Sequence, residues 1–229
     1  MLGPIHYFYL AAFAVTAVCT LLLVRRYLEQ RNTLSLAFTF VIGASTVFCL
    51  LMFGRGFFDA GSDGSILMYR AAMVATTVIP ALLSIFLFYP LILERKQTGK
   101  DMLVRVVLLF IWVFAIVGML LISVLPSTHL YAMYEFDVYS VSYGPISYTM
   151  VLAIPVLTVL IDALVIMMMV IRENEKFYKM RALLLMLGWL LVLAGELVLL
   201  VPILLILNPL LFVTGTVIMA LAILRKAPT

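Results

Sequence analysis

Charged residues and cysteines are scarce in this sequence. Only 11% of the 229 residues are charged, whereas 66% are hydrophobic, and the mean hydropathy is +1.23. A soluble domain of this length does not have such a composition, so we predict an integral membrane protein. Cys19 and Cys49 fall inside apolar segments at different depths, which argues against a disulfide between them, and no metal-type cysteine spacing occurs.

Catalytic and cofactor motifs are missing as well. The sequence has no HExxH, no glycine-rich phosphate loop, no nucleophile elbow and no paired histidines for haem. Its last apolar segment has no lysine for a Schiff base, which excludes covalent retinal. His6, His129, Glu135 and Asp137 match no known metal-site spacing. We therefore predict a protein that is not an enzyme and that has no metal and no cofactor.

The positive charge of the chain raises the question of nucleic acid. The 15 lysines and arginines outnumber the 11 acidic residues, and the formal net charge is +4. Nucleic-acid binding requires a continuous basic patch, whereas these residues are scattered between apolar runs. We therefore expect the lipid bilayer, and not nucleic acid, to be the partner.

Seven apolar segments are long enough to cross about 30 Å of hydrocarbon at about 1.5 Å per residue. They predict an all-α bundle of seven transmembrane helices, with kinks at Pro80 and Pro155. Pro202, Asn208 and Pro209 favour a tight turn between the last two segments over one long broken hairpin. The segments, all in one membrane domain over residues 1–229, are approximately 5–24, 34–53, 66–93, 102–124, 146–171, 182–203 and 207–224.

The distribution of basic residues predicts the orientation. All of the 15 lysines and arginines except Arg55 and Arg70 fall on one side of the predicted spans. By the positive-inside rule the N-terminus is outside and the C-terminus is cytoplasmic in a multi-pass protein of the cell membrane. The N-terminus has no basic n-region, which favours a first span over a cleaved signal peptide.

Charges inside the apolar segments are the candidate functional residues. By helical rise, Arg70 and Glu196 both lie in the outer half and can form an ion pair if their helices are neighbours. Thr77, Tyr148 and Asn208 supply hydrogen-bonding groups at this depth, so we predict a ligand-binding site there. The alternative is that the ion pair only sets the helix register.

A second intramembrane charge pair is predicted nearer the cytoplasmic side. Asp162 lies deep in the fifth segment, and Arg105 lies about one turn inside the fourth. A carboxylate at that depth needs a partner, a water-filled cavity or a raised pKa. The pair is therefore either a structural contact or part of a proton pathway.

The connection between the fourth and fifth segments is the longest and is rich in aromatic residues. Amphipathic rings at headgroup depth are typical of an interfacial belt, and the alternative is a lid over an outward-facing pocket. The aromatic residues of this connection are Tyr131, Tyr134, Phe136, Tyr139 and Tyr143.

Short motifs spread over nearly the whole chain carry a family resemblance. They are Arg25-Arg26-Tyr27, Tyr69-Arg70, Ile79-Pro80-Ala81, Phe86-Leu87-Phe88-Tyr89, Thr128-His129-Leu130, Tyr143-Gly144-Pro145, Asn208-Pro209 and Ala220 to Arg225. In these the chain resembles the seven-helix N-terminal membrane region of prokaryotic sensor histidine kinases. The resemblance implies that the outer half receives a signal and that the cytoplasmic end of the seventh segment passes it on. No histidine-bearing dimerisation helix and no ATP-binding domain occur in the sequence, so kinase activity is not implied.

Together these observations predict a receptor-like sensory module. We expect it to bind a small or lipidic ligand from the outer half and to signal through a cytoplasmic or membrane protein partner. Two alternatives remain open. One is a non-catalytic accessory subunit of a larger membrane complex, and the other is a small-solute or proton-coupled transporter that uses Asp162 and Glu196.

Overall fold

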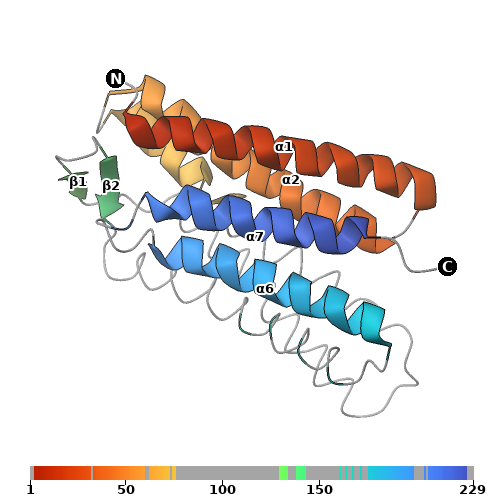
Figure 1. Cartoon of the computed structure of the whole chain (residues 1–229). Coiled ribbons are helices and arrows are strands. Elements are labelled where there is room, and N and C mark those ends of the chain that lie inside the picture. Colours follow the sequence, from red (N-terminus) through yellow and green to blue (C-terminus); the bar gives the residue numbers. More distant parts are fainter. Residues whose placement is uncertain are drawn as a thin grey trace, which may run out of the picture.

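Four long helices form a bundle in the computed structural model (Figure 1). They are α1 (Pro4–Gln30), α2 (Thr33–Gly54), α6 (Lys176–Val198) and α7 (Leu207–Leu224). A 3-10 turn, η1 (Arg55–Phe57), follows α2, and residues 63–72 and 74–75 are again helical. The structure describes residues 3–31, 33–59, 62–72, 74–75, 129–133, 138–142, 160, 163, 167, 171, 175–198, 204 and 206–225.

The four long helices confirm the helical part of the predicted fold class. Each is long and apolar enough to cross a membrane. They correspond to the first, second, sixth and seventh predicted spans. The fourth predicted span, 102–124, lies outside the described residues, and most of spans 66–93 and 146–171, with the predicted kinks, lies outside them too.

Helix α1 is longer than the predicted first span, because it continues past Val24 into polar sequence. Apolarity marks the part of a helix that lies in hydrocarbon, and it does not mark where the backbone stops being helical. An ion pair one turn apart, Arg25 Nε to Glu29 Oε1 at 2.9 Å, supports the exposed extension. The helix ends where Arg31 adopts the left-handed conformation (φ 51°) and its N–H donates to the Tyr27 carbonyl.

The start of α6 also differs from the predicted bounds of the sixth span, whereas α7 has the predicted bounds of the seventh, 207–224. Helix α6 begins at Lys176, within the predicted basic connection, so its first turns are amphiphilic rather than apolar. Helix α7 begins at Leu207, and both Asn208 and Pro209 lie in its first turn instead of in the connection before it. Proline is favoured in a first turn, because the N–H that it lacks has no partner within the helix there.

Helix α7 lies at the centre of the described bundle and packs against α1, α2 and α6 (Figure 1). Hydrogen bonds at both of its ends show that α1 and α7 run in the same direction: Tyr9 of α1 contacts Asn208 of α7, and Arg26 contacts Leu224. Helix α6 runs the opposite way. The two chain ends therefore lie at opposite ends of the bundle.

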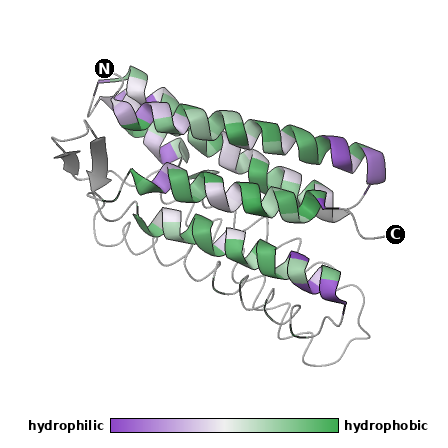
Figure 2. Cartoon of the chain, in the orientation of Figure 1, coloured by the Kyte–Doolittle hydropathy of each residue, from purple (hydrophilic) through white to green (hydrophobic). Residues whose placement is uncertain are grey.

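Polar and apolar side chains are distributed as a hydrocarbon environment requires. Large apolar side chains such as Leu21 and Leu221 are mostly exposed, whereas the hydroxyls of Thr16 and Ser45 are buried and donate to carbonyls one turn earlier, those of Ala12 and Val41. Figure 2 shows hydrophobic residues along the helices and hydrophilic residues at the two ends of the bundle.

Aromatic rings join three helices in the core. The Tyr9 ring meets the Phe48 ring of α2 edge-on with centroids 6.0 Å apart, and Phe48 lies 4.9 Å from Phe212 of α7. All three side chains are at most 1% exposed. Such aromatic pairs add to the packing energy beyond the area that they bury.

A two-stranded antiparallel hairpin lies within the aromatic connection, where a loop was predicted. Strand β1 (His129–Met133) pairs with β2 (Val138–Ser142), with His129 opposite Ser142 and Met133 opposite Val138. Valine and tyrosine favour extended backbone, which explains the strands. The hairpin lies at the end of the bundle where α1 begins (Figure 1).

Candidate ligand-binding site

A cluster around one buried arginine, Arg55, lies at the end of the bundle where α1 begins. Arg55 of η1 is only 8% exposed; its Nε donates to the Ser65 hydroxyl at 3.1 Å, and its guanidinium lies 4.9 Å from the centre of the Tyr69 ring. A buried guanidinium requires hydrogen-bond acceptors and an electron-rich face, and these two side chains provide one of each. We call Arg55, Ser65 and Tyr69 the Arg55 cluster.

Local capping explains how the chain brings these three residues together. The Ser62 hydroxyl accepts the backbone N–H of Ser65 at 3.3 Å, and its carbonyl accepts the N–H of Ile66, so Ser62 caps the helix that starts at residue 63. The short turn of η1 folds the chain back before this cap. Ser65 and Tyr69 lie one turn apart on the new helix and therefore face Arg55 from the same side.

The start of α1 borders the Arg55 cluster. The His6 ring accepts the backbone N–H of Gly3 at 3.1 Å, which closes the first turn of α1. His6 also lies close enough to Arg55 for their charges to interact. His6 of α1 thus borders the cluster, whose own residues come from η1 and the helix that starts at residue 63.

A second buried polar contact links three helices at the same end. The Tyr9 hydroxyl donates to Asn208 Oδ1 at 2.6 Å, and Asn208 Nδ2 donates to the Gly195 carbonyl at 2.8 Å. Asn208 is fully buried. One amide therefore bonds α7 to both α1 and α6, and unmaking either bond would leave a buried polar group unsatisfied.

The predicted ligand-binding residues lie partly at this end. Arg70 follows Tyr69 directly and is half-buried, and Asn208 uses its amide within the protein as described above. Glu196 follows Gly195 in α6, but its side chain is outside the described residues, as are Thr77 and Tyr148. The predicted pairing of Arg70 with Glu196 therefore stays a prediction.

The structure says less about the second predicted charge pair and about metal binding. Asp162 and Arg105 both lie outside the described residues. Within the part of the chain that the structure describes, no group of three histidine, cysteine, aspartate or glutamate side chains is placed to hold a metal ion.

Sequence reasoning overlooked the Arg55 cluster. Arg55 stands between two glycines after a long apolar run, which is typical of an exposed loop, so its burial could not be inferred. The one available signal was Ser62, a residue type that commonly caps a helix start, and a helix from there would have included Tyr69.

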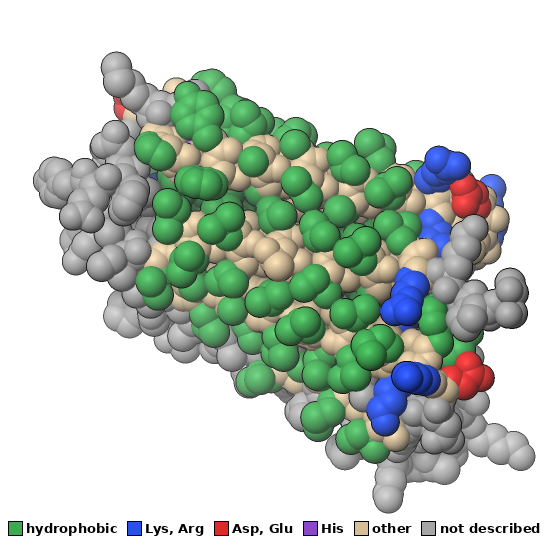
Figure 3. Space-filling model, viewed as in Figure 1, with side chains coloured by type: hydrophobic (Ala, Val, Ile, Leu, Met, Phe, Trp, Pro, Cys, Tyr) green, Lys and Arg blue, Asp and Glu red, His purple; other side chains and the backbone are tan. Residues whose placement is uncertain are grey.

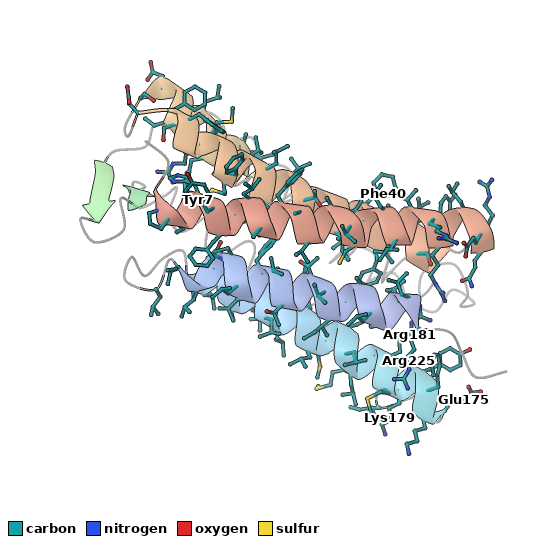
Figure 4. All side chains as sticks on the ribbon, turned by 45° about the horizontal axis from the view of Figure 1, so that its top comes forward. Tyr7, Phe40, Glu175, Lys179, Arg181 and Arg225 are labelled. Atoms are coloured by element: carbon teal, nitrogen blue, oxygen red, sulfur yellow. The ribbon has the colours of Figure 1, made fainter. Side chains whose placement is uncertain are left out.

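The opposite end of α7 is held by two arginines from its neighbours. Arg26 Nη1 of α1 donates to the Leu224 carbonyl at 3.0 Å, and Arg181 Nη2 of α6 donates to the Ile223 carbonyl at 3.2 Å. The last carbonyls of a helix have no partner within it and carry partial negative charge, which these cations offset. Figure 4 shows Arg181 and Arg225 together at this end, far from Tyr7.

Comparison with known proteins adds no family to this description. The chain matches no protein-family model, and a search of curated proteins gives no match.

Proposed function

We propose that the protein is a receptor-like sensory module of the cell membrane with seven spans. Its N-terminus is outside, and a small or lipidic ligand enters from the outer half. The four described helices have the length and apolarity of membrane spans, which supports the location. The resemblance to the membrane region of sensor histidine kinases supports the same function class.

The directions of the helices and the position of the basic side chains agree with the proposed number and orientation of the spans. Because α1 and α7 run in the same direction, the number of crossings from the first to the last is odd, as it is for seven. Figure 3 shows lysine and arginine side chains gathered at one end of the bundle. The positive-inside rule makes that end cytoplasmic. The described basic residues there are Arg25, Arg26, Arg31, Lys176, Lys179, Arg181 and Arg225.

The single observation that carries the signalling proposal is that α7 is bonded at both ends to the same two helices. At the outer end its partners are Tyr9 and the Gly195 carbonyl, and at the inner end they are Arg26 and Arg181. About 24 Å of helix separates the two sets of bonds. A ligand that shifts the outer contacts would move α7 as a rigid helix. The inner end of α7 lies at the basic cytoplasmic surface, which would move with it.

The ligand is expected beside the Arg55 cluster, near Arg70 and Glu196. The buried polar side chains that the structure describes in the outer half lie at this end of the bundle. Such groups can recognise a ligand by exchanging a partner within the protein for one on the ligand. A ligand can shift the equilibrium between two arrangements of α7 only if it binds one of them more tightly.

Gentle purification from the native membrane, followed by mass spectrometry of bound small molecules and proteins, tests this function. A small molecule that copurifies with the wild type and is lost in Arg70→Ala would support it. Copurification of a large membrane complex without any small molecule would instead favour the accessory-subunit reading. Flux in liposomes that disappears in Asp162→Asn would favour a transporter.

Hydrogen exchange tests the role of α7 separately. Tyr9→Phe removes the hydroxyl bonded to Asn208, and we expect faster amide exchange near Leu224, at the far end of the helix. Tyr7→Phe is the control, because Tyr7 is 57% exposed on the same helix. Faster exchange confined to the first turns of α7 would contradict transmission along the helix.

A further inference from the structure

The two arginines at the inner end of α7 bring more positive charge than the helix end neutralises. Arg26 and Arg181 each carry a full charge, and because they bond adjacent carbonyls these charges lie close enough to repel one another. A helix C-terminus supplies only about −0.5. Within the described part of the chain, neither Arg26 nor Arg181 forms an ion pair with a carboxylate. Counted over the described residues alone, a charge of about +1.5 is left between the two side chains.

Both guanidiniums also have a donor without an acceptor. The Nε atoms of Arg26 and Arg181 are buried, and neither has a hydrogen-bond partner in the described part of the chain. An unmade bond of this kind destabilises the fold, and more so for a charged group. Both side chains are half-buried, so a ligand would meet the outer part of each guanidinium and not the buried Nε atoms. Phosphate oxygens fit a guanidinium well, because they accept two parallel bonds and carry negative charge.

The position of the two arginines along the bundle suits a lipid headgroup. Arg26 lies about 33 Å along α1 from Pro4, close to the thickness of the hydrocarbon layer, so it lies at the level of the lipid phosphates. Exposed leucines lie within about one turn of this end on its hydrocarbon side: Leu22 is 44%, Leu183 37% and Leu221 59% exposed. Figure 3 shows the basic end bordering directly on this apolar surface.

We propose that Arg26 and Arg181 bind the phosphate of an anionic glycerophospholipid at the inner end of α7. Its acyl chains lie against the exposed leucines of α1, α6 and α7. The lipid neutralises the excess charge and holds α1 and α6 together across the end of α7. Lys176 and Lys179 at the start of α6 raise the local concentration of anionic lipid.

Native mass spectrometry of the full chain in mild detergent, titrated with phosphatidylglycerol, tests the site. We expect the wild type to retain one phosphatidylglycerol, and Arg26→Ala and Arg181→Ala to weaken its retention about tenfold or more, as for a lost charge-assisted bond. Arg25→Ala is the matched control. It removes the same charge one residue away, but its side chain is 78% exposed and paired with Glu29, so we expect less than a twofold change.

Lysine variants keep the test decisive if an alanine variant fails to fold. Arg26→Lys and Arg181→Lys preserve the charge and lose the fork, so we expect severalfold weaker retention. Equal loss in Arg25→Ala would overturn the proposal, because it would show diffuse attraction to the basic end. Phosphatidylcholine retained as well as phosphatidylglycerol would overturn the requirement for an anionic lipid. Displacement by inorganic phosphate at the same concentration would show that free phosphate is the ligand, and would overturn the lipid assignment.

Discussion

Gly188 of α6 and Gly215 of α7 face one another with no room for a methyl group between them. A Cβ on Gly188 would lie 2.6 Å from the Gly215 carbonyl oxygen, and a Cβ on Gly215 would lie 2.5 Å from the Gly188 carbonyl oxygen. Real Cβ atoms do not approach so closely, and the backbone on the other side cannot rotate away as a side chain can. Small residues at such a contact allow two membrane helices to pack along their backbones.

Alanine at either glycine should therefore destabilise the protein. Overpacking costs about 1–3 kcal/mol, which exceeds the roughly 1 kcal/mol that alanine gains over glycine in a helix. We expect Gly188→Ala and Gly215→Ala to lower the midpoint of thermal unfolding in detergent. Gly195→Ala is the control, because its nearest atoms would lie at 3.5 Å, an ordinary contact distance. An unchanged or raised midpoint in both variants would show that α6 and α7 are not packed this closely.

Loss of the Tyr9 hydroxyl should destabilise the outer end of the bundle. In Tyr9→Phe the buried Asn208 Oδ1 loses a 2.6 Å bond, and we expect a loss of about 1–3 kcal/mol in the free energy of unfolding. Chemical denaturation measures this difference. Tyr7→Phe should leave the free energy almost unchanged, and a similar loss in the two variants would contradict a specific role for the Tyr9 bond.

Loss of the Ser65 hydroxyl should destabilise the Arg55 cluster. Ser65→Ala removes the acceptor of the Arg55 Nε bond at 3.1 Å, and because Ser65 is only 3% exposed we expect a loss of about 1–3 kcal/mol. Thr214→Ala is the control and should leave the free energy of unfolding almost unchanged. Thr214 is exposed, and its hydroxyl bonds only within its own helix, to the Leu210 carbonyl. Comparable unfolding midpoints for the Ser65 variant and the wild type would show that Arg55 does not depend on this bond.

The proposed orientation predicts which side chains a membrane-impermeant thiol reagent reaches. Asp59 follows η1 at the outer end and Glu175 directly precedes α6 at the inner end, and both are exposed. In a background without Cys19 and Cys49, Asp59→Cys should be labelled in intact cells, and Glu175→Cys only after the cells are permeabilised. The reverse pattern would mean that the basic end is outside and that the positive-inside rule fails for this chain.

Much of the helical fold follows from apolarity alone. Segments 5–24, 34–53, 182–203 and 207–224 all correspond to helices, because about 20 consecutive apolar residues have few stable alternatives to a helix in hydrocarbon. Helix ends were predicted less well. Helix α1 passes Val24 to Gln30, since hydrophobicity reports the membrane boundary, whereas the last turn depends on local capping and ion pairs.

The candidate site depended far more on tertiary structure. The sequence marked Asn208 as a polar residue at membrane depth, but only the packing of α1, α6 and α7 decided that its amide bonds Tyr9 and the Gly195 carbonyl. Burial of Arg55 was likewise invisible, because partners such as Ser65 become neighbours only after η1 reverses the chain.

What the sequence determined by itself is the class of protein, an apolar helical bundle with most of its basic residues at one end. Hydropathy and charge are sums over residues and need no knowledge of contacts. Which groups meet was decided only by tertiary structure. Hydrogen bonds and close backbone contacts depend on the direction and rotation of each helix to within about an ångström, and a periodic apolar pattern does not set these. The two arginines on the end of α7 and the glycine pair between α6 and α7 are of this second kind.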